Sequence, residues 1–361
     1  MKKVLALLLA LAMVFSFAAC GKKEDDKQEA AKWPTDNVQF LCPNGVGTLN
    51  DVNVHTIADY LKEKNGITME VVNNDVGGGA ELIQQLVASE GDGLTMMLIG
   101  SNNLYNYYTG TWPINPTDWS KIKIVCGFIQ PLPESGCVIQ TQADSPYSTW
   151  DELVAYAKAN PGKVTIASTP GKVMDPKMKS LMLQTGLSEY LHWVPTDSKG
   201  ATTGLQNGDI NLVINDEATY AKNIKAAAAD KSVYLHGVKG IINCRPDDDF
   251  SYYTADIMPA DELEIVKKCP TFVQVFGKDK AVTYNVPNRS VVIVPASTPD
   301  DICAQIAAAI DAIGTEKTGA WWDRVHANGG STMYYTWPGA EIQEEWTRLD
   351  QIFKDAAAMK F

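Results

Sequence analysis

Short loops rich in glycine and hydroxyl residues follow several apolar segments, and these residue types suit the binding of a small anion. Gly45 and Gly47 let the main chain approach a ligand without a Cβ in the way, while Thr48 and Ser101 add hydroxyl groups. A hydrogen bond to a charged group contributes about 1.5 to 3 kcal/mol, so three or four of them approach the roughly 8 kcal/mol of a micromolar complex. The alternative interpretation of Gly45 and Gly47 is a tight turn without a ligand.

Signatures of catalysis are missing from the sequence. It has no G-x-S-x-G, no phosphate-binding G-x-x-x-x-G-K-[ST] and no H-E-x-x-H. The glycines at 77–79 lack the rest of a nucleotide-binding fingerprint, and the aspartates at 247–249 are typical of a solvated turn rather than a calcium site. We therefore expect a protein that is not an enzyme and that uses no cofactor and no metal. The four histidines are expected to be surface or core residues: His55, His192, His236 and His326.

Alternating apolar strands and amphipathic helices are expected to position the loops. The alternation predicts an α/β fold, in which ligands lie beyond the carboxyl ends of the strands and helix N-termini point N–H groups at them. Predicted strands are 38–42, 67–72, 94–99, 164–167, 192–194, 210–214, 233–236 and 290–294. Predicted helices are 54–65, 80–89, 150–160, 176–187, 199–206, 217–230, 300–313, 317–327 and 339–358.

The order of these elements predicts two lobes. Three helices with one strand cannot form a sheet domain alone, so the last third should pack back onto the first lobe. The first lobe then comprises 37–135 plus 288–361, and the second, with its own parallel sheet, comprises 136–287. Two crossings between the lobes predict a hinge and a cleft.

The N-terminus resembles a bacterial lipoprotein export signal. A short apolar run follows Lys2 and Lys3 and ends in Phe-Ala-Ala before Cys20. We expect 1–19 to be a signal peptide, Cys20 to be lipidated and 20–36 to form a polar tether on the extracytoplasmic face of the cell membrane. The alternatives are a retained helix and an unmodified secreted chain.

Charge and composition limit the partners. The net charge of -12 disfavours nucleic acid and anionic membrane surfaces, and no arginine precedes Arg245 to clamp an anion in the first 240 residues. Without the lipidated residue six cysteines remain, which allow disulfides such as Cys126 with Cys137 or Cys244 with Cys269. Six free thiols are the alternative, and the full set is Cys42, Cys126, Cys137, Cys244, Cys269 and Cys303.

A colinear series of motifs resembles the substrate-binding proteins of tripartite tricarboxylate transporters, the Bug or TctC family. The segment 152–163, ELVAYAKANPGK, is nearly identical to that family's consensus sequence. The other matching segments are 43–51, 74–79, 92–95, 100–101, 167–168, 194–195, 199–200, 208–209, 295–296 and 298–299. The resemblance covers nearly all of the mature domain.

The resemblance implies a two-lobed periplasmic-binding-protein fold of the Venus flytrap type, with two Rossmann-like lobes and a hinge. It implies capture of a small carboxylate by main-chain N–H groups and bridging waters, and delivery to membrane permease subunits. We expect the protein to be a monomer. It implies a structural role for Asp51 in fixing the first loop. The implied ligand-binding residues are Gly45, Val46, Gly47, Thr48, Gly78, Gly79, Ser101, Asn102, Ser168, Thr169, Gly171, Lys172, Asn215 and Asp216.

The chain departs from the family pattern at several places. Pro170 removes one N–H donor from the second-lobe loop and Lys172 adds a charge, while His55 stands where the family usually has arginine. The segment 240–286 follows the pattern poorly. Two other functions stay open: a sensory lipoprotein that signals to a membrane kinase, and an exported hydrolase that uses Ser168 or Ser101.

Overall fold

The computed structural model describes residues 32–129, 136–169, 174–251, 253, 255, 258–287, 289–315 and 335–359. The chain divides into two units, Met1–Lys32 and Trp33–Phe361, and the second is the folded part described below. The predicted signal peptide and most of the predicted tether, including Cys20, lie outside the described residues.

The first lobe is built on a mixed sheet of six strands in the order β11-β4-β10-β3-β1-β2. Strands β2, β1 and β3 are parallel, whereas β10 runs antiparallel to β3 and β4, and β11 runs antiparallel to β4. Strand β10 is buried along its whole length, as expected for a strand in the middle of a covered sheet. The strand bounds are β1 Val38–Cys42, β2 Met69–Asn73, β3 Thr95–Gly100, β4 Ile122–Ile129, β10 Arg289–Pro295 and β11 Tyr335–Pro338.

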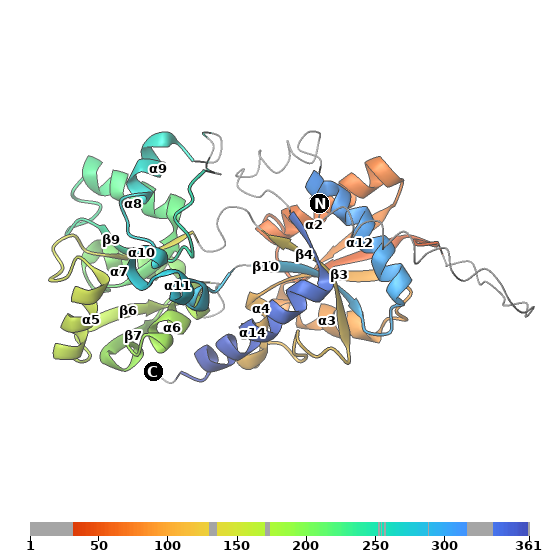
Figure 1. Cartoon of the computed structure of the whole chain (residues 1–361), viewed down its shortest axis with the longest axis horizontal. Helices are drawn as coiled ribbons and strands as arrows, with labels where there is room; N and C mark the ends of the chain where they lie inside the picture. Colours follow the sequence, from red (N-terminus) through yellow and green to blue (C-terminus); the bar gives the residue numbers. More distant parts are fainter. Residues whose placement is uncertain are drawn as a thin grey trace, which may run out of the picture. The chain divides into compact units, whose positions relative to one another are not determined.

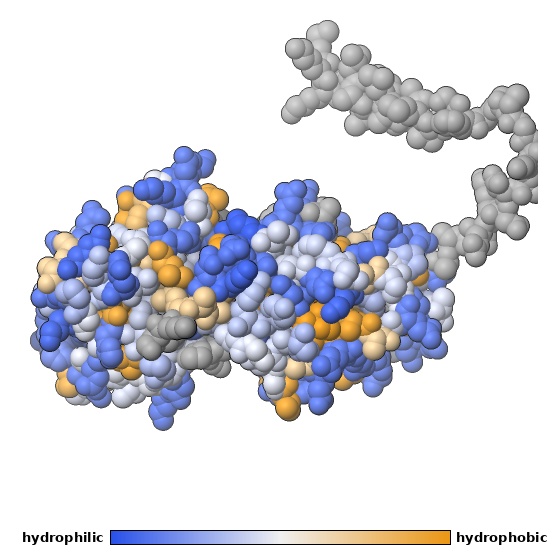
Figure 2. Space-filling model, turned by 90° about the horizontal axis from the view of Figure 1, so that it is seen from below, coloured by the Kyte–Doolittle hydropathy of each residue, from blue (hydrophilic) through white to orange (hydrophobic). Residues whose placement is uncertain are grey.

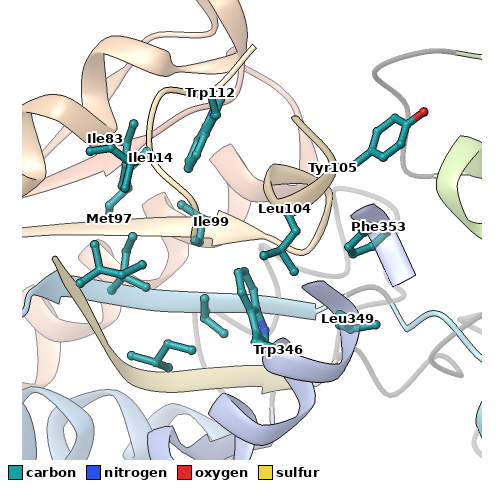
Figure 3. Close-up of a cluster of buried hydrophobic side chains, with 14 of the residues drawn as sticks. Ile83, Met97, Ile99, Leu104, Tyr105, Trp112, Ile114, Trp346, Leu349 and Phe353 are labelled. Carbon is teal, nitrogen blue, oxygen red and sulfur yellow. The ribbon is translucent and has the colours of Figure 1, made fainter. Parts of the chain in front are cut away.

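Helices cover both faces of this sheet. Ile57 of α2 and Ile306 of α12 belong to one buried cluster, and Ile83 of α3, Leu104 of α4 and Trp346 of α14 belong to another. Figure 3 shows Trp346 and Leu104 facing each other in the second cluster. The bounds are α2 Leu49–Asn65, η1 Val76–Gly78, α3 Ala80–Ala88, α4 Asn102–Tyr108, α12 Asp300–Thr315 and α14 Gly339–Ala357.

The second lobe has a different strand arrangement from the one predicted. Strand β5 is antiparallel to both β8 and β9, and only β6 and β7 form a parallel pair. A bridge between Ile166 and Leu212 joins the two groups. The expectation of a fully parallel second sheet is therefore wrong, because β5 enters from the first lobe and runs against its neighbours. The bounds are β5 Cys137–Thr141, β6 Val164–Ser168, β7 Leu191–Pro195, β8 Val213–Asp216 and β9 Lys239–Asn243.

The helices of the second lobe include three that the sequence did not predict, α9, α10 and α11. The strand predicted at 233–236 is also wrong: these residues form a turn, Leu235 is exposed, and the strand is β9. The bounds are α5 Trp150–Ala159, α6 Met174–Gln184, η2 Ser188–Tyr190, α7 Ser198–Asn207, α8 Glu217–Ala229, α9 Ala260–Val266, α10 Phe272–Phe276 and α11 Lys278–Tyr284.

Figure 1 shows the two α/β lobes, with β3, β4 and β10 in one and β6, β7 and β9 in the other. No described helix combines the length and apolarity that a membrane crossing requires. The face in Figure 2 is mainly hydrophilic, and its apolar side chains are scattered in small patches. The candidates for a binding site are the loops at the carboxyl ends of the strands, as the sequence predicted.

Candidate functional site

The predicted loops of the first lobe lie together because they follow adjacent parallel strands. Asp51, near the start of α2, is the residue that connects them. Its Oδ2 accepts a hydrogen bond from the Gly47 N–H at 2.8 Å, and its Oδ1 accepts one from Asn73 Nδ2 at 2.8 Å. Thr48 caps α2, since its Oγ1 accepts from the Asp51 N–H at 3.4 Å. The loop after β1 is thus fixed to the end of β2 by a buried carboxylate.

Gly79 allows the next loop to pack directly against the first. Its φ is +81°, and a Cβ at this position would lie 2.2 Å from Pro43 Cβ. The N–H groups of Gly78 and Gly79 donate to Asp75 and Val76 within the turn, and the Gly78 carbonyl accepts from Trp112 Nε1 at 2.6 Å. These two glycines shape the loop, while their N–H groups already have partners inside the chain.

At the tip of the first loop, two main-chain N–H groups have no hydrogen-bond partner within the described part of the chain. The structure has no hydrogen bond from the N–H groups of Gly45 and Val46 to any described residue, and Val46 is 83 % exposed. Gly45 packs closely enough that an added Cβ would lie 2.8 Å from Asp75 Oδ2. The N–H groups of Gly45 and Val46 are therefore available to a ligand beside the Asp75 carboxylate, whereas the Gly47 N–H is held by Asp51.

Ser101, directly after β3, forms hydrogen bonds within the protein. Its Oγ donates to the Pro287 carbonyl at 3.2 Å and accepts from the Arg289 N–H at 3.4 Å, and its own N–H donates to the Arg289 carbonyl at 2.8 Å. The residue is fully buried. These bonds connect β3 to the start of β10, where the chain enters the first lobe for the second time. Asn102 follows at the start of α4 and is half-buried.

In the second lobe, Asp175 accepts from the two predicted donors after β6. Ser168 Oγ donates to Asp175 Oδ1 at 2.8 Å, and the Thr169 N–H donates to the same oxygen at 2.9 Å. Asp175 is near the N-terminus of α6, where a carboxylate is favoured by the helix dipole. The position predicted for a ligand carboxylate near these donors is thus filled by a side chain of the protein.

The second oxygen of Asp175 joins the two lobes. Tyr105 of α4 donates its hydroxyl to Asp175 Oδ2 at 2.9 Å, and Lys179 Nζ lies 2.8 Å from both that carboxylate oxygen and the tyrosine oxygen. Figure 3 shows the Tyr105 hydroxyl directed away from Leu104 and Phe353. Burial, followed by the Asp175 charge, raises the pKa of Tyr105, so the hydroxyl remains a donor at neutral pH.

The end of β8 contributes Asn215 and Asp216. Asp216 caps α8, accepting from the Thr219 N–H at 2.7 Å and from Thr219 Oγ1 at 2.7 Å, while Asn215 is half-buried. Next to them the buried Glu217 accepts hydrogen bonds from Asn243 and Tyr253, and its Oε1 lies 3.7 Å from Arg245 Nη1. Burial raises the pKa of Glu217, and Arg245 opposes that effect.

Part of the predicted site lies outside the described residues, namely Gly171 and Lys172 together with the neighbouring Pro170. His326 also lies outside them. Among the described residues no cluster of histidine, cysteine and carboxylate could hold a metal ion. The six cysteines after Cys20 are free, so the two disulfide pairings considered above are not formed in this structure.

Sequence reasoning missed Asp175, Tyr105 and Lys179, which hold the loop after β6. One signal was available for Asp175, because an aspartate directly before Pro176 is typical of a helix start. No local signal marks Tyr105, since its partner is 70 residues away in sequence.

The described elements define a class of fold: the two-lobed α/β fold of periplasmic binding proteins. A TctC solute-binding protein from Polaromonas has a TM-score of 0.67 with 16 % identity, covering 90 % of this chain and 99 % of that chain. A Rhodopseudomonas palustris protein in complex with adipate has a TM-score of 0.56 and 16 % identity, covering 90 % of this chain and 98 % of that chain. MatC from the same organism, with bound malate, has a TM-score of 0.54 and 14 % identity, covering 90 % of this chain and 100 % of that chain. At these identities the likeness shows the fold alone.

Sequence comparison adds the family. Residues 54–228 match the tripartite tricarboxylate transporter family receptor, TctC. The "UPF0065 protein in gbd 5′region" of Cupriavidus necator is 27 % identical over 192 residues, 53 % of this chain and 56 % of that protein. A UPF0065 protein of Bordetella pertussis is 26 % identical over 142 residues, 38 % of this chain and 42 % of that protein. The chain thus spans about half the length of these curated relatives. The predicted resemblance to the TctC family is confirmed, and the family match covers residues 54–228.

Proposed function

We propose that the protein captures a small carboxylate between its two lobes and delivers it to the permease subunits of a tripartite tricarboxylate transporter. The observation that carries the proposal is a pair of main-chain N–H groups, those of Gly45 and Val46, in the loop after β1. Neither N–H group has a hydrogen-bond partner among the described residues. Related folds have been solved with adipate and with malate, both dicarboxylates. Ligand contacts are assigned to Gly45 and Val46 in the first lobe and to the end of β8 in the second, since Asp175 already occupies the donors of Ser168 and Thr169.

The proposal includes the cellular setting. Lipid at Cys20 and the tether to residue 36 would keep the receptor on the extracytoplasmic face of the membrane, near its permease, and so raise the local concentration. The proposal keeps the lobe boundaries that the sequence predicts, 37–135 plus 288–361 for the first lobe and 136–287 for the second. The protein would act as a monomer, without a cofactor.

A ligand screen tests the carboxylate part of the proposal. Purified protein is examined by thermal shift and isothermal calorimetry with malate, adipate, a tricarboxylate, an aromatic acid and an amino acid. A saturable rise in Tm with at least one carboxylate is expected, since a ligand at 100 times its Kd stabilises by about 2.7 kcal/mol. The absence of binding across the whole panel would contradict the proposal.

A sensory role is the second candidate function, because a receptor closed on its ligand could equally signal to a membrane kinase. Crosslinking of the membrane-anchored protein in the presence and absence of its ligand separates the two. Recovery of permease subunits supports transport, and recovery of a kinase alone supports sensing.

A further inference from the structure

Four cationic side chains are buried in the described part of the chain, and one of them lacks an anionic partner. Arg245, Arg289 and Lys179 each lie within 4.0 Å of a carboxylate, at Glu217, Glu345 and Asp175 respectively. Lys177, in α6, is only 7 % exposed, and its Nζ makes one hydrogen bond and no ion pair with the described residues, the hydrogen bond being to Cys137 Sγ at 3.8 Å. Lys177 is therefore a buried cation opposite a thiol.

The thiol does not supply the missing negative charge. Burial raises the pKa of Cys137, and although the ammonium of Lys177 opposes this effect, the net shift is upward, so the thiol stays neutral at neutral pH. Two carboxylates, Asp216 and Glu217, are close enough to influence Cys137, but neither lies within 4.0 Å of Lys177 Nζ. Asp216 caps α8, and Glu217 faces Arg245.

The position of Lys177 connects it with the candidate site. Cys137 is opposite Asp216 across the antiparallel pair β5–β8, so the Lys177 ammonium lies near the carboxyl end of β8. Helix α6 also holds Asp175, which accepts from the predicted ligand donors Ser168 and Thr169. A buried, unpaired cation costs several kcal/mol of desolvation, and a ligand anion would compensate that cost.

We propose that Lys177 is a ligand-recognition residue whose ammonium pairs with one carboxylate of a dianionic ligand. This inference rests on the proposed function. It assigns the second carboxylate of the ligand to the second lobe, while the main-chain N–H groups of Gly45 and Val46 hold the first. A side-chain charge contact would make the protein prefer dicarboxylates over monocarboxylates of the same length.

The test compares Lys177→Met with the wild type and with a control, Lys163→Met, which removes the same charge from an exposed position of the same lobe. Calorimetry measures binding of malate, adipate and the monoamide of adipate. Lys177→Met should weaken dicarboxylate binding by about 10- to 100-fold, the range expected for one charged hydrogen bond. It should also bind adipate and its monoamide with more similar affinities than the wild type does. Lys163→Met should leave all affinities within about two-fold.

The Tm of the ligand-free variant provides a second test, because a lysine with a purely structural role would lower the Tm when it is replaced. Without ligand, Lys177→Met should have a Tm equal to or above that of the wild type, because an unpaired buried charge is replaced by an apolar side chain of similar length. Should this variant not fold, Lys177→Gln serves in the same comparison. Wild-type affinity retained in a folded Lys177 variant overturns this inference alone. No binding by the wild-type protein overturns the carboxylate proposal and this inference with it.

Discussion

At the scale of single residues, the first loop shows how one glycine determines the packing of another segment. Gly79 combines a left-handed φ of +81° with close contact to Pro43. Gly162 has a similar φ of +74°, but a Cβ added there would meet no other atom within 4 Å. Backbone strain is therefore common to both positions, and the steric clash is specific to Gly79.

We predict that Gly79→Ala destabilises the protein more than Gly162→Ala. The left-handed backbone costs an alanine about 1 to 2 kcal/mol at either site, and the clash with Pro43 adds about 1 to 3 kcal/mol. Urea unfolding of the two variants measures the difference directly. Equal destabilisation would mean that Pro43 moves away without cost.

The Cys42 thiol predicts a pH effect of defined sign. Burial is the main factor that raises its pKa from 9.0 to about 11. Because the folded pKa exceeds the unfolded one, the contribution to stability is complete below pH 9 and is lost as the pH rises towards 11. Between pH 9 and pH 11, the free energy of unfolding should therefore fall less in Cys42→Ala than in the wild type, by on the order of 2 to 3 kcal/mol. Parallel pH profiles for the variant and the wild type would contradict this.

At the scale of elements, α6 depends on one internal ion pair. Asp175 and Lys179 are one helical turn apart, their side chains are 0 % and 4 % exposed, and Asp175 also fixes Ser168 and Thr169. The loop after β6 and the helix that follows it therefore form a single unit held by a carboxylate.

We predict that Asp175→Asn costs about 3 to 5 kcal/mol in the free energy of unfolding, because it removes the negative charge opposite the buried Lys179 ammonium. The double variant Asp175→Asn with Lys179→Met should recover part of this loss. Chemical denaturation of the single and double variants measures the coupling between the two residues. Strictly additive effects would show that the pair contributes nothing as a pair.

The elements that the sequence predicted correctly are those with strong local signals. A capping box of Thr149 and Glu152 begins α5, which the sequence placed at 150–160, and Gly66 ends α2 in the left-handed conformation. The same kind of signal was overlooked at Thr271 and Gln274, whose capping box begins α10. Capping residues act within four positions, so they can be recognised without knowing the fold.

Strand pairing could not be predicted in the same way. The alternating residues 233–236 resemble a strand, but Val233 and Leu235 are 38 % and 63 % exposed in a turn. The less apolar segment of β9 becomes the strand because β5 pairs with it. The same reason applies to the site: Ser168 and Thr169 were predicted from their loop, but their partner Asp175 is connected to Tyr105 only by the tertiary structure. Their roles in ligand binding remain predictions.

At the scale of the whole molecule, Tyr105 is a physical link between the lobes, because its ring packs in the first-lobe cluster and its hydroxyl donates to Asp175. Helix α14 adds a second link: Trp346 and Phe353 pack in that cluster, and Met359, just after the helix, packs against the cluster of the second lobe. Any movement of one lobe against the other therefore acts on α4, α6 and α14 together.

The net charge of -12 makes a prediction about how an anionic ligand arrives. The global field repels a dicarboxylate, and the repulsion extends about 30 Å at 0.01 M salt but only about 8 Å at 0.15 M. The association rate of adipate should therefore rise with salt, by a factor of about two or more over this range, opposite to the behaviour of an electrostatically attracted ligand. Stopped-flow tryptophan fluorescence measures this rate, with uncharged adipamide as the control whose rate should not change. An adipate rate that falls with salt would instead mean that the local field of cations such as Lys177 dominates over the charge of the whole molecule.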